Sequence, residues 1–285
     1  MRDGFLPVDK PSGPTSHDVV ACVRKRFDTR RVGHAGTLDP FATGLLLVFV
    51  GRATRLVQFL SGLPKQYTGT IALGAATTTD DHTGDTLRTS DAWRALTDQD
   101  ISAAMQTLTG RHEQQPPVFS AKKVGGHPAH RLARRGIAVT LAPQWVDVGR
   151  FALTRRDGSD LAFEASVGSG VYVRALARDL GELLGCGAHL RELRRVAIGP
   201  FRVDQAVTLD AVVNGAVTLR PAAEAVGHLE AVQLDEAARA DVRHGRAIRG
   251  GETAVAPVAL LAGTELIGIA QPADGLLHPK VVLDA

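Results

Sequence analysis

The residues best suited to chemistry lie in segment 30–44, where two arginines, a histidine and an aspartate share a stretch with three glycines. Pro40 favours an extended backbone at Asp39, and Gly36 and Gly44 permit turns that other residues resist. The apolar run that follows is typical of a buried strand. We therefore expect one carboxylate, able to act as a nucleophile, on a shaped loop near cations. The alternative is an ordinary surface turn, which describes most Asp-Pro sequences.

A metal site is not expected in this segment. His34 and Asp39 have no further ligands at a suitable spacing, and the other histidines are scattered. Cys22 and Cys186 are far apart and form no metal or disulfide pattern. No apolar run approaches the roughly 18 residues that a membrane span requires. We therefore expect a protein without a membrane segment, in a reducing cytoplasm.

Residues 33–44 follow the pattern Gly-His-x-Gly-x-Leu-Asp-Pro-x-Ala-x-Gly, and four further motif-like segments lie at 8–16, 65–67, 170–181 and 185–195. In this order, the five segments resemble the signature motifs of the TruB family of tRNA pseudouridine-55 synthases. Five ordered matches within roughly the first two hundred residues argue against chance agreement.

The resemblance implies an isomerase that converts uridine 55 in the T loop of tRNA to pseudouridine, with no cofactor. Asp39 would be the nucleophile. Arg174 would lie beside it and keep its carboxylate ionised. Tyr67 would stack on the displaced base and help to deprotonate carbon 5, although a strand tyrosine is more often a core residue. Attack at carbon 1′, attack at carbon 6 and proton removal at carbon 2′ all stay open.

Other residues are implied to contact the RNA after the target uridine has left its stack. The resemblance has His34 entering the T loop, Tyr172 and Leu193 closing the uracil pocket, and Asp81 either binding a base edge or ordering the pocket. Lys10 would either support the loop or bind phosphate. An insertion at about 111–136 would clasp the RNA, and its basic residues include Lys123 and Arg131.

Arginine dominates the basic residues, accounting for 27 of 33 in a chain of net charge +3. Arginine suits phosphates and bases, although a GC-rich genome also enriches it. We expect the T arm of tRNA as the partner, with no obligate protein partner and a monomeric enzyme. Two alternatives are a tRNA-binding folding chaperone without catalysis and a guide-RNA-dependent pseudouridine synthase. The intact set of Asp39, Tyr67 and Arg174 argues against the chaperone, and the insertion argues against the guide-dependent type.

Strand and helix patterns do not alternate regularly along the chain, which indicates an α+β fold. The resemblance implies a pseudouridine synthase fold over 1–220, with a long mixed, mainly antiparallel sheet and a central cleft. A small PUA-like β domain would follow over 221–285. Hydrophobic periodicity predicts helices from Thr15, over 53–60, from Thr97, and over 173–184. It predicts strands at 5–8, 45–50, 67–73, 145–148, 151–154, 161–167, 255–261, 266–270 and 281–283.

Overall fold

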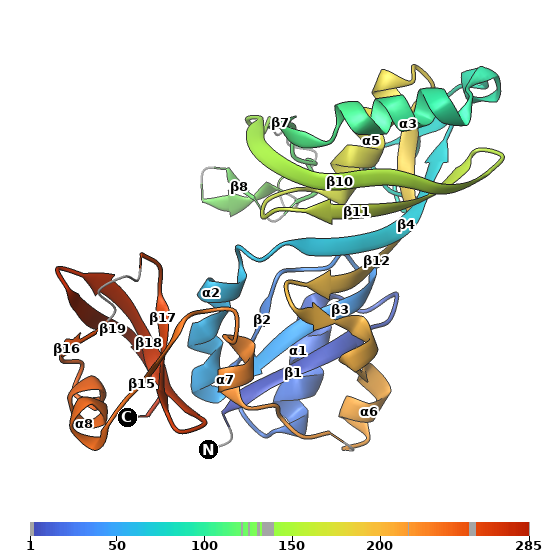
Figure 1. Ribbon diagram of the computed structural model, residues 1–285. Coiled ribbons are helices and arrows are strands. Elements are labelled where there is room, and N and C mark those ends of the chain that lie inside the picture. Colours follow the sequence, from blue (N-terminus) through green and yellow to red (C-terminus); the bar gives the residue numbers. More distant parts are fainter. Residues whose placement is uncertain are drawn as a thin grey trace. The chain divides into compact units, whose positions relative to one another are not determined.

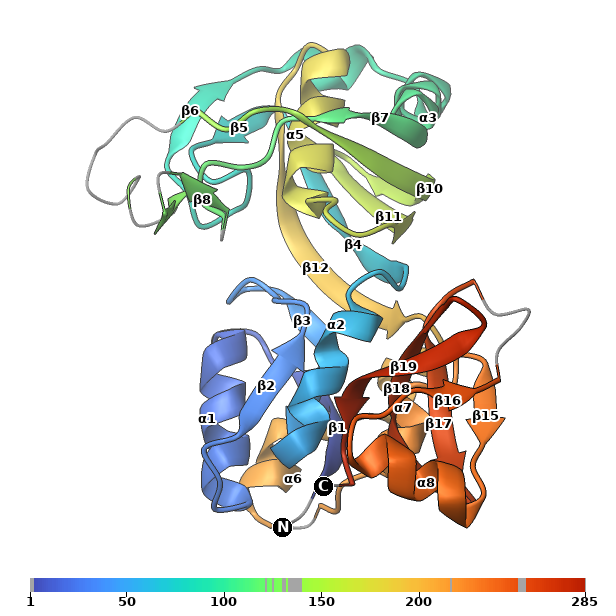
Figure 2. The same ribbon diagram turned by 90° about the vertical axis from the view of Figure 1, so that its left-hand side faces the viewer.

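The computed structural model describes residues 3–120, 122–124, 126–129, 132, 140–215, 217–250 and 255–284. The chain forms two compact units, one of Met1–Gly62 with Pro200–Ala285 and the other of Leu63–Gly199. Both units combine strands with helices, without regular alternation (Figure 1 and Figure 2). This arrangement confirms the predicted α+β class. Within the described residues, no helix is both long and apolar enough to cross a membrane.

In the first unit, a mixed sheet is built around β1 (Gly4–Lys10). This strand pairs antiparallel with β3 (Thr43–Val50) and parallel with β14 (Val207–Thr208), and β2 (Val32–Ala35) pairs antiparallel with β3. Helix α1 (Ser16–Arg26) lies against these strands (Figure 1). The other elements of this part are η1 (Gly51–Leu56), α2 (Val57–Leu60), β13 (Phe201–Arg202), η3 (Val203–Gln205), α6 (Leu209–Val213) and α7 (Ala222–Ala225).

Helix α1 begins where the sequence predicts. Thr15 accepts a hydrogen bond from the Asp18 amide, and the Asp18 carboxylate accepts one from the Thr15 amide, so the capping box is complete. Val19, Val20 and Val23 are buried in one cluster with apolar side chains of β1 and β3. The apolar face of α1 therefore anchors the end of the motif at residues 8–16 to the sheet.

Residues 231–282 form a small five-stranded sheet with strand order β15-β17-β18-β19-β16. Its strands and α8 enclose an apolar core of their own, which includes Val242, Leu260 and Ile267. This sheet confirms the predicted small C-terminal β domain, while its boundary at residue 221 stays a prediction. The elements are β15 (Ala231–Gln233), α8 (Glu236–Arg243), β16 (Ile248–Arg249), β17 (Val258–Ala262), β18 (Glu265–Ala273) and β19 (Leu276–Val282).

The second unit is built on an antiparallel sheet with strand order β12-β4-β11-β10-β7. Helix α5 packs against β12 and α3 packs against β10, and the two helices contact each other (Figure 2). The main elements are β4 (Lys65–Leu73), α3 (Asp98–Thr107), β7 (Gly110–Gln114), β10 (Gln144–Asp157), β11 (Asp160–Val167), α5 (Val173–Leu183) and β12 (Ala188–Ile198). The shorter ones are β5 (Ala75–Thr77), β6 (Thr86–Thr89), η2 (Ala92–Ala95), β8 (Lys123–Val124) and β9 (His127–Pro128).

Several elements differ from the prediction, including short strands such as β2 and β7 that were not predicted as strands. The helix expected over 53–60 is a 3-10 helix followed by the single α-helical turn of α2. The strands expected at 145–148 and 151–154 are one strand, β10, because irregular register steps absorb the interruption without ending the pairing with β11. Strand β12 was not predicted as a strand, since its arginines and glutamate obscure the alternation of apolar residues.

Candidate active site

The loop that carries Asp39 joins β2 to β3 in the first unit. Gly36 and Gly44 have φ angles of 86° and 102°, which confirms that these positions require glycine. Leu38 lies between these two glycines. The Ser16 hydroxyl accepts a hydrogen bond from the Leu38 amide (2.9 Å) and donates one to the Leu38 carbonyl (3.1 Å). Ser16 is buried in the first turn of α1. The residue next to Asp39 is therefore fixed to the start of a helix.

Lys10 supports the same loop from β1. Its side chain is 0% exposed, and Nζ donates to the carbonyls of Pro11 (2.9 Å), Pro14 (2.8 Å) and Pro40 (3.0 Å). The Gly13 amide also donates to the Pro40 carbonyl, at 2.9 Å. The three protons of the ammonium group are thus used to join the first motif to the residue that follows Asp39. Of the two predicted roles of Lys10, this geometry favours support of the loop.

Lys10→Met should lower the free energy of unfolding by about 2–4 kcal/mol, because buried carbonyls lose a charged donor. Urea unfolding measures the change. Lys25→Met is the matched control, since Lys25 is exposed on α1, and it should change stability by no more than about 0.5 kcal/mol. Equal stability of the Lys10 variant and the unmodified chain would contradict the supporting role.

His34 lies on β2, opposite Val48 of β3, and its side chain is half-buried. It precedes the left-handed turn at Gly36 by two residues. The residue therefore sits on a regular strand that leads into the Asp39 loop, and its predicted entry into the T loop stays a prediction.

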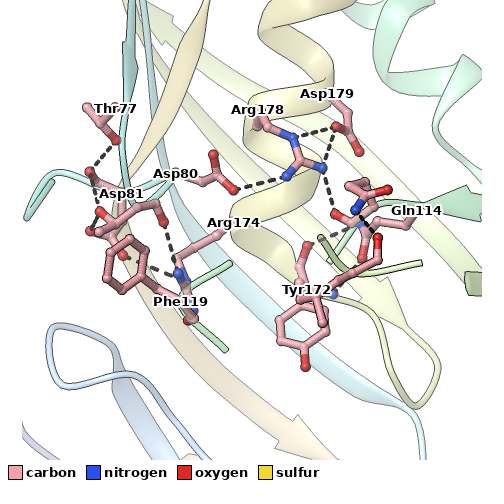
Figure 3. A network of polar contacts seen from close by, with 12 residues as sticks. Thr77, Asp80, Asp81, Gln114, Phe119, Tyr172, Arg174, Arg178 and Asp179 are labelled. Atoms are coloured by element: carbon pink, nitrogen blue, oxygen red, sulfur yellow. Dashed lines mark hydrogen bonds and ion pairs between the residues drawn. The ribbon is translucent and has the colours of Figure 1, made fainter. Parts of the chain in front are cut away.

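In the second unit, Arg174 and Asp81 form a buried pair (Figure 3). Nε of Arg174 lies 3.7 Å from Oδ2 of Asp81, and both side chains are 6% exposed. The guanidinium group also donates to the carbonyls of Thr79 and Phe119, each at 2.9 Å. The Arg174 side chain is therefore buried and bound to two backbone carbonyls as well as to Asp81. Its predicted pairing with Asp39 of the first unit stays a prediction.

Asp81 is bound within its own turn as well. Its Oδ1 accepts hydrogen bonds from the Thr79 hydroxyl (2.7 Å), the Thr83 amide (2.9 Å) and the Thr83 hydroxyl (2.6 Å). The Thr77 hydroxyl donates to the Asp81 carbonyl at 2.7 Å. These contacts favour the predicted ordering role of Asp81 over contact with a base edge.

Gln114 is a supporting residue that the sequence analysis missed. Its fully buried side-chain amide accepts a hydrogen bond from the Tyr172 amide (2.9 Å) and donates one to the Tyr172 carbonyl (3.2 Å). Tyr172 is the N-cap of α5 and makes no side-chain cap of its own, so Gln114 fixes the start of the helix that carries Arg174. The Tyr172 ring points away from the polar network (Figure 3). No sequence signal singled out Gln114, because it stands within the polar run Arg111 to Gln115.

Tyr67 lies on β4, in the interior of the antiparallel sheet, between Ala165 of β11 and Arg195 of β12. Two positions further along β4, Gly69 faces the buried Leu193 of β12. A side chain at Gly69 would lie 2.2 Å from the carbonyl oxygen of Glu192, so the close approach of these strands requires glycine. Tyr67 and Leu193 are therefore carried by two adjoining, tightly paired strands.

Two basic residues, Arg195 and Lys65, lie near Tyr67 on the paired strands β12 and β4. Arg195 is buried, and burial lowers the pKa of Lys65, with the nearby charge of Arg195 lowering it further. Nζ of Lys65 donates to the Leu63 carbonyl at 2.8 Å. The side chain of Lys123 and all of Arg131 lie outside the described residues, so their predicted RNA contacts stay predictions.

Sequence comparison identifies the chain by domains. The model of the N-terminal domain of TruB family pseudouridylate synthases matches residues 24–173, more than half of the chain. The chain belongs to the TruB family. The tRNA pseudouridylate synthase B C-terminal domain matches residues 174–236, and the C-terminal domain of pseudouridine synthase II TruB matches 231–283. TruB membership confirms the predicted family and makes this protein a pseudouridine synthase, an isomerase.

Individual TruB relatives are similar over most of the chain. The tRNA pseudouridine synthase B of Thermobifida fusca is 45% identical over 293 residues, covering 99% of this chain and 99% of the relative. That of Geobacter sulfurreducens is 44% identical over 249 residues, covering 85% of this chain and 82% of the relative. Both similarities extend well beyond the five motifs.

Solved structures show the same fold. A chain of a Cbf5–Nop10–Gar1 complex superposes with a TM-score of 0.73 at 30% identity, covering 94% of this chain and 78% of that chain. A chain of an H/ACA RNP bound to a substrate RNA containing 2′-deoxyuridine gives a TM-score of 0.75 at 25% identity, covering 98% of this chain and 84% of that chain. These similarities confirm the predicted pseudouridine synthase fold.

Proposed function

We propose that this TruB enzyme isomerises uridine 55 in the T loop of tRNA to pseudouridine, and that the T arm of tRNA is its binding partner. The observation that carries the proposal is the end-to-end similarity to the Thermobifida fusca relative, which is named tRNA pseudouridine synthase B. We further propose that the enzyme is cytoplasmic and monomeric and has no obligate protein partner.

The reaction is an isomerisation, so it needs no oxidant, reductant or co-substrate. The bond between ribose carbon 1′ and uracil nitrogen 1 breaks, and a bond from carbon 1′ to uracil carbon 5 forms. Carbon 5 loses a proton and nitrogen 1 gains one. The enzyme must therefore supply a group that starts the cleavage, a pocket that holds the detached base, and a proton acceptor.

Asp39 is the proposed nucleophile, because a carboxylate can form a covalent intermediate with an activated sugar or base. Support comes from the loop itself, since Ser16 and Lys10 hold the backbone on both sides of Asp39. Arg174 is the proposed cation that acts with this carboxylate, and Tyr67 is the proposed group at carbon 5. His34 would occupy the space that the flipped uridine leaves in the RNA stack.

Guide-RNA-dependent catalysis is the second candidate, because the structural neighbours described above come from a Cbf5–Nop10–Gar1 complex and an H/ACA RNP. The higher sequence identity to the tRNA pseudouridine synthase B relatives favours the stand-alone enzyme. The Cbf5-complex chain is 30% identical, whereas the tRNA pseudouridine synthase B relatives are 44% and 45% identical. A tRNA chaperone without catalysis is disfavoured, since binding alone does not require Asp39, Tyr67 and Arg174 together.

The proposal is tested by incubating the purified chain with an unmodified tRNA transcript, derivatising pseudouridine selectively because it has the same mass as uridine, and locating the derivative by mass spectrometry or primer-stop mapping. We expect one pseudouridine, at position 55, without any added protein or guide RNA. A transcript with cytidine at position 55 is the matched control and should yield none. Product that forms only with added guide RNA would support the second candidate instead, and product at another position would refute the proposed site.

A further inference from the structure

Three side chains on one face of α5 form ion pairs on successive helical turns. Arg174, Arg178 and Glu182 are spaced four residues apart, so they lie along the same side of the helix. Their partners are, in order, Asp81, Asp80 and Arg88. The side chains are 6% and 6% exposed in the first pair, 21% and 14% in the second, and 52% and 54% in the third. The second pair is thus largely buried next to the first, and the third lies in solvent.

Arg178 contacts the same two segments as Arg174 (Figure 3). Its Nη1 donates to Oδ2 of Asp80 at 3.1 Å, and its Nη2 donates to the Gln115 carbonyl at 2.7 Å. Its Nε donates to Oδ1 of Asp179 at 2.9 Å. Arg174 likewise contacts the Asp81 carboxylate of the 77–84 turn and the Phe119 carbonyl of the 115–119 segment. Both segments are therefore attached to α5 twice, by guanidinium groups one turn apart.

The backbone of Asp80 makes this double attachment possible. In an extended chain, neighbouring side chains point in opposite directions, so two consecutive aspartates would not both reach one helix. Asp80 has a φ of 61°, in the left-handed region, where aspartate is tolerated better than most residues. The turn therefore directs both Asp80 and Asp81 toward α5. An unfavourable backbone angle held by surrounding contacts is a feature that often accompanies function.

Because Asp80 is largely buried, its ionised form depends on the charge of Arg178. Burial raises the pKa of Asp80, and the charges of Arg178 and Arg174 oppose that rise. Without Arg178, the carboxyl group would lose a hydrogen-bond donor and the nearby positive charge that most favours its ionised form. The turn would then keep one of its two attachments to α5.

We propose that Arg178 and Asp80 are positioning residues, which hold the 77–84 turn and the 115–119 segment against α5 so that Arg174 and Asp81 keep the orientation that the isomerisation requires. This inference rests on the proposed function for its effect on turnover. It assigns to the second ion pair a role in the reaction although neither residue contacts the reacting atoms.

The test compares Asp80→Asn, Arg178→Gln and the double variant in steady-state isomerisation of tRNA. Asparagine keeps the shape of Asp80 and tolerates the left-handed backbone. Each single variant should lower kcat about tenfold, with KM for tRNA changed less than about twofold, since orientation affects the transition state more than binding. The double variant should be no slower than the slower single variant, because the two residues act through one contact.

Two further variants separate positioning from general stabilisation. Arg178→Lys keeps the charge but cannot reach both Asp80 and Gln115, so its kcat should lie between those of Arg178→Gln and the unmodified enzyme. Arg88→Gln breaks the exposed pair on the same helix face and should leave kcat within about twofold, since exposed ion pairs contribute little. If Arg178→Gln fails to fold, Asp80→Asn makes the same test with a smaller change.

Hydrogen exchange at the Thr83 amide, which donates to Asp81 at 2.9 Å, gives a readout that does not depend on activity. Exchange there should accelerate in Arg178→Gln and Asp80→Asn, and stay unchanged in Arg88→Gln. Unchanged exchange, unchanged kcat, or additive losses in the double variant would each overturn the inference. If the unmodified enzyme forms no pseudouridine in tRNA, the proposed function fails, and the exchange rates alone decide whether the pair orders the turn.

Discussion

Asp39→Asn should reduce isomerisation below detection while tRNA affinity stays within about tenfold, or ~1.4 kcal/mol of binding free energy. Asparagine nearly matches aspartate in shape but lacks the negative charge and the nucleophilic carboxylate. The hydrogen bonds that hold the loop at Leu38 and Pro40 come from Ser16 and Lys10, so the loop should keep its conformation. Mass spectrometry of a treated tRNA transcript, after selective derivatisation of pseudouridine, measures turnover, and filter binding measures affinity.

Asp28→Asn is the control for this experiment. Asp28 lies in the same unit, is exposed, and has a φ of 46° that asparagine tolerates. Its replacement also removes one negative charge from this unit, without changing the Asp39 loop, and we expect full turnover. Appreciable product from the Asp39 variant would exclude this carboxylate as the essential group.

Tyr67→Phe should leave folding and tRNA binding intact while product formation collapses, by at least about a hundredfold if the hydroxyl takes part in proton transfer. The ring remains available for stacking on the base. The backbone of Tyr67 pairs with Ala165 and Arg195 on its two sides, so loss of the hydroxyl should not disturb the sheet. Single-turnover kinetics at saturating enzyme measure the chemical step apart from binding.

Tyr172→Phe is the matched control, because Tyr67 and Tyr172 are the two tyrosines of the chain. Gln114 holds the backbone of Tyr172, and the hydroxyl takes no part in that contact. We expect this variant to retain turnover within about tenfold, since a residue that closes the pocket acts mainly through its ring. Near-normal turnover in Tyr67→Phe would leave Tyr67 as a packing residue.

Several features followed from sequence alone because they depend on neighbouring residues. A proline after Asp39 and glycines at positions 36 and 44 set the backbone of the loop through local steric limits, and the φ angles of both glycines agree. The capping box at Thr15 depends on a residue three positions away. The order of the five motifs was sufficient to predict the family, which the domain matches confirmed.

Local patterns were least informative where a strand contains charged or interrupting residues. Strand β12 carries Arg191, Arg194 and Arg195, and its pairing with β4 on the sheet stabilises a conformation that its own pattern does not specify. The register steps in β10 similarly exist because β11 continues alongside it. In both cases the partner strand, rather than the local sequence, determines the element.

The hydrogen-bond partners of the supporting residues are determined only by the tertiary structure. Gln114 contacts Tyr172 across 58 positions, Arg174 contacts Thr79 across 95, and Arg178 contacts Asp80 across 98. For Lys10, the fold brings three carbonyl groups around its ammonium, which favours the loop-supporting role of the two that were predicted. The side chains of arginine, lysine and glutamine can donate hydrogen bonds to many acceptors with similar energies. The local sequence around such a residue therefore does not specify its partner. Packing of the backbone selects it, because a buried polar group must bond to whichever acceptor the fold brings within reach.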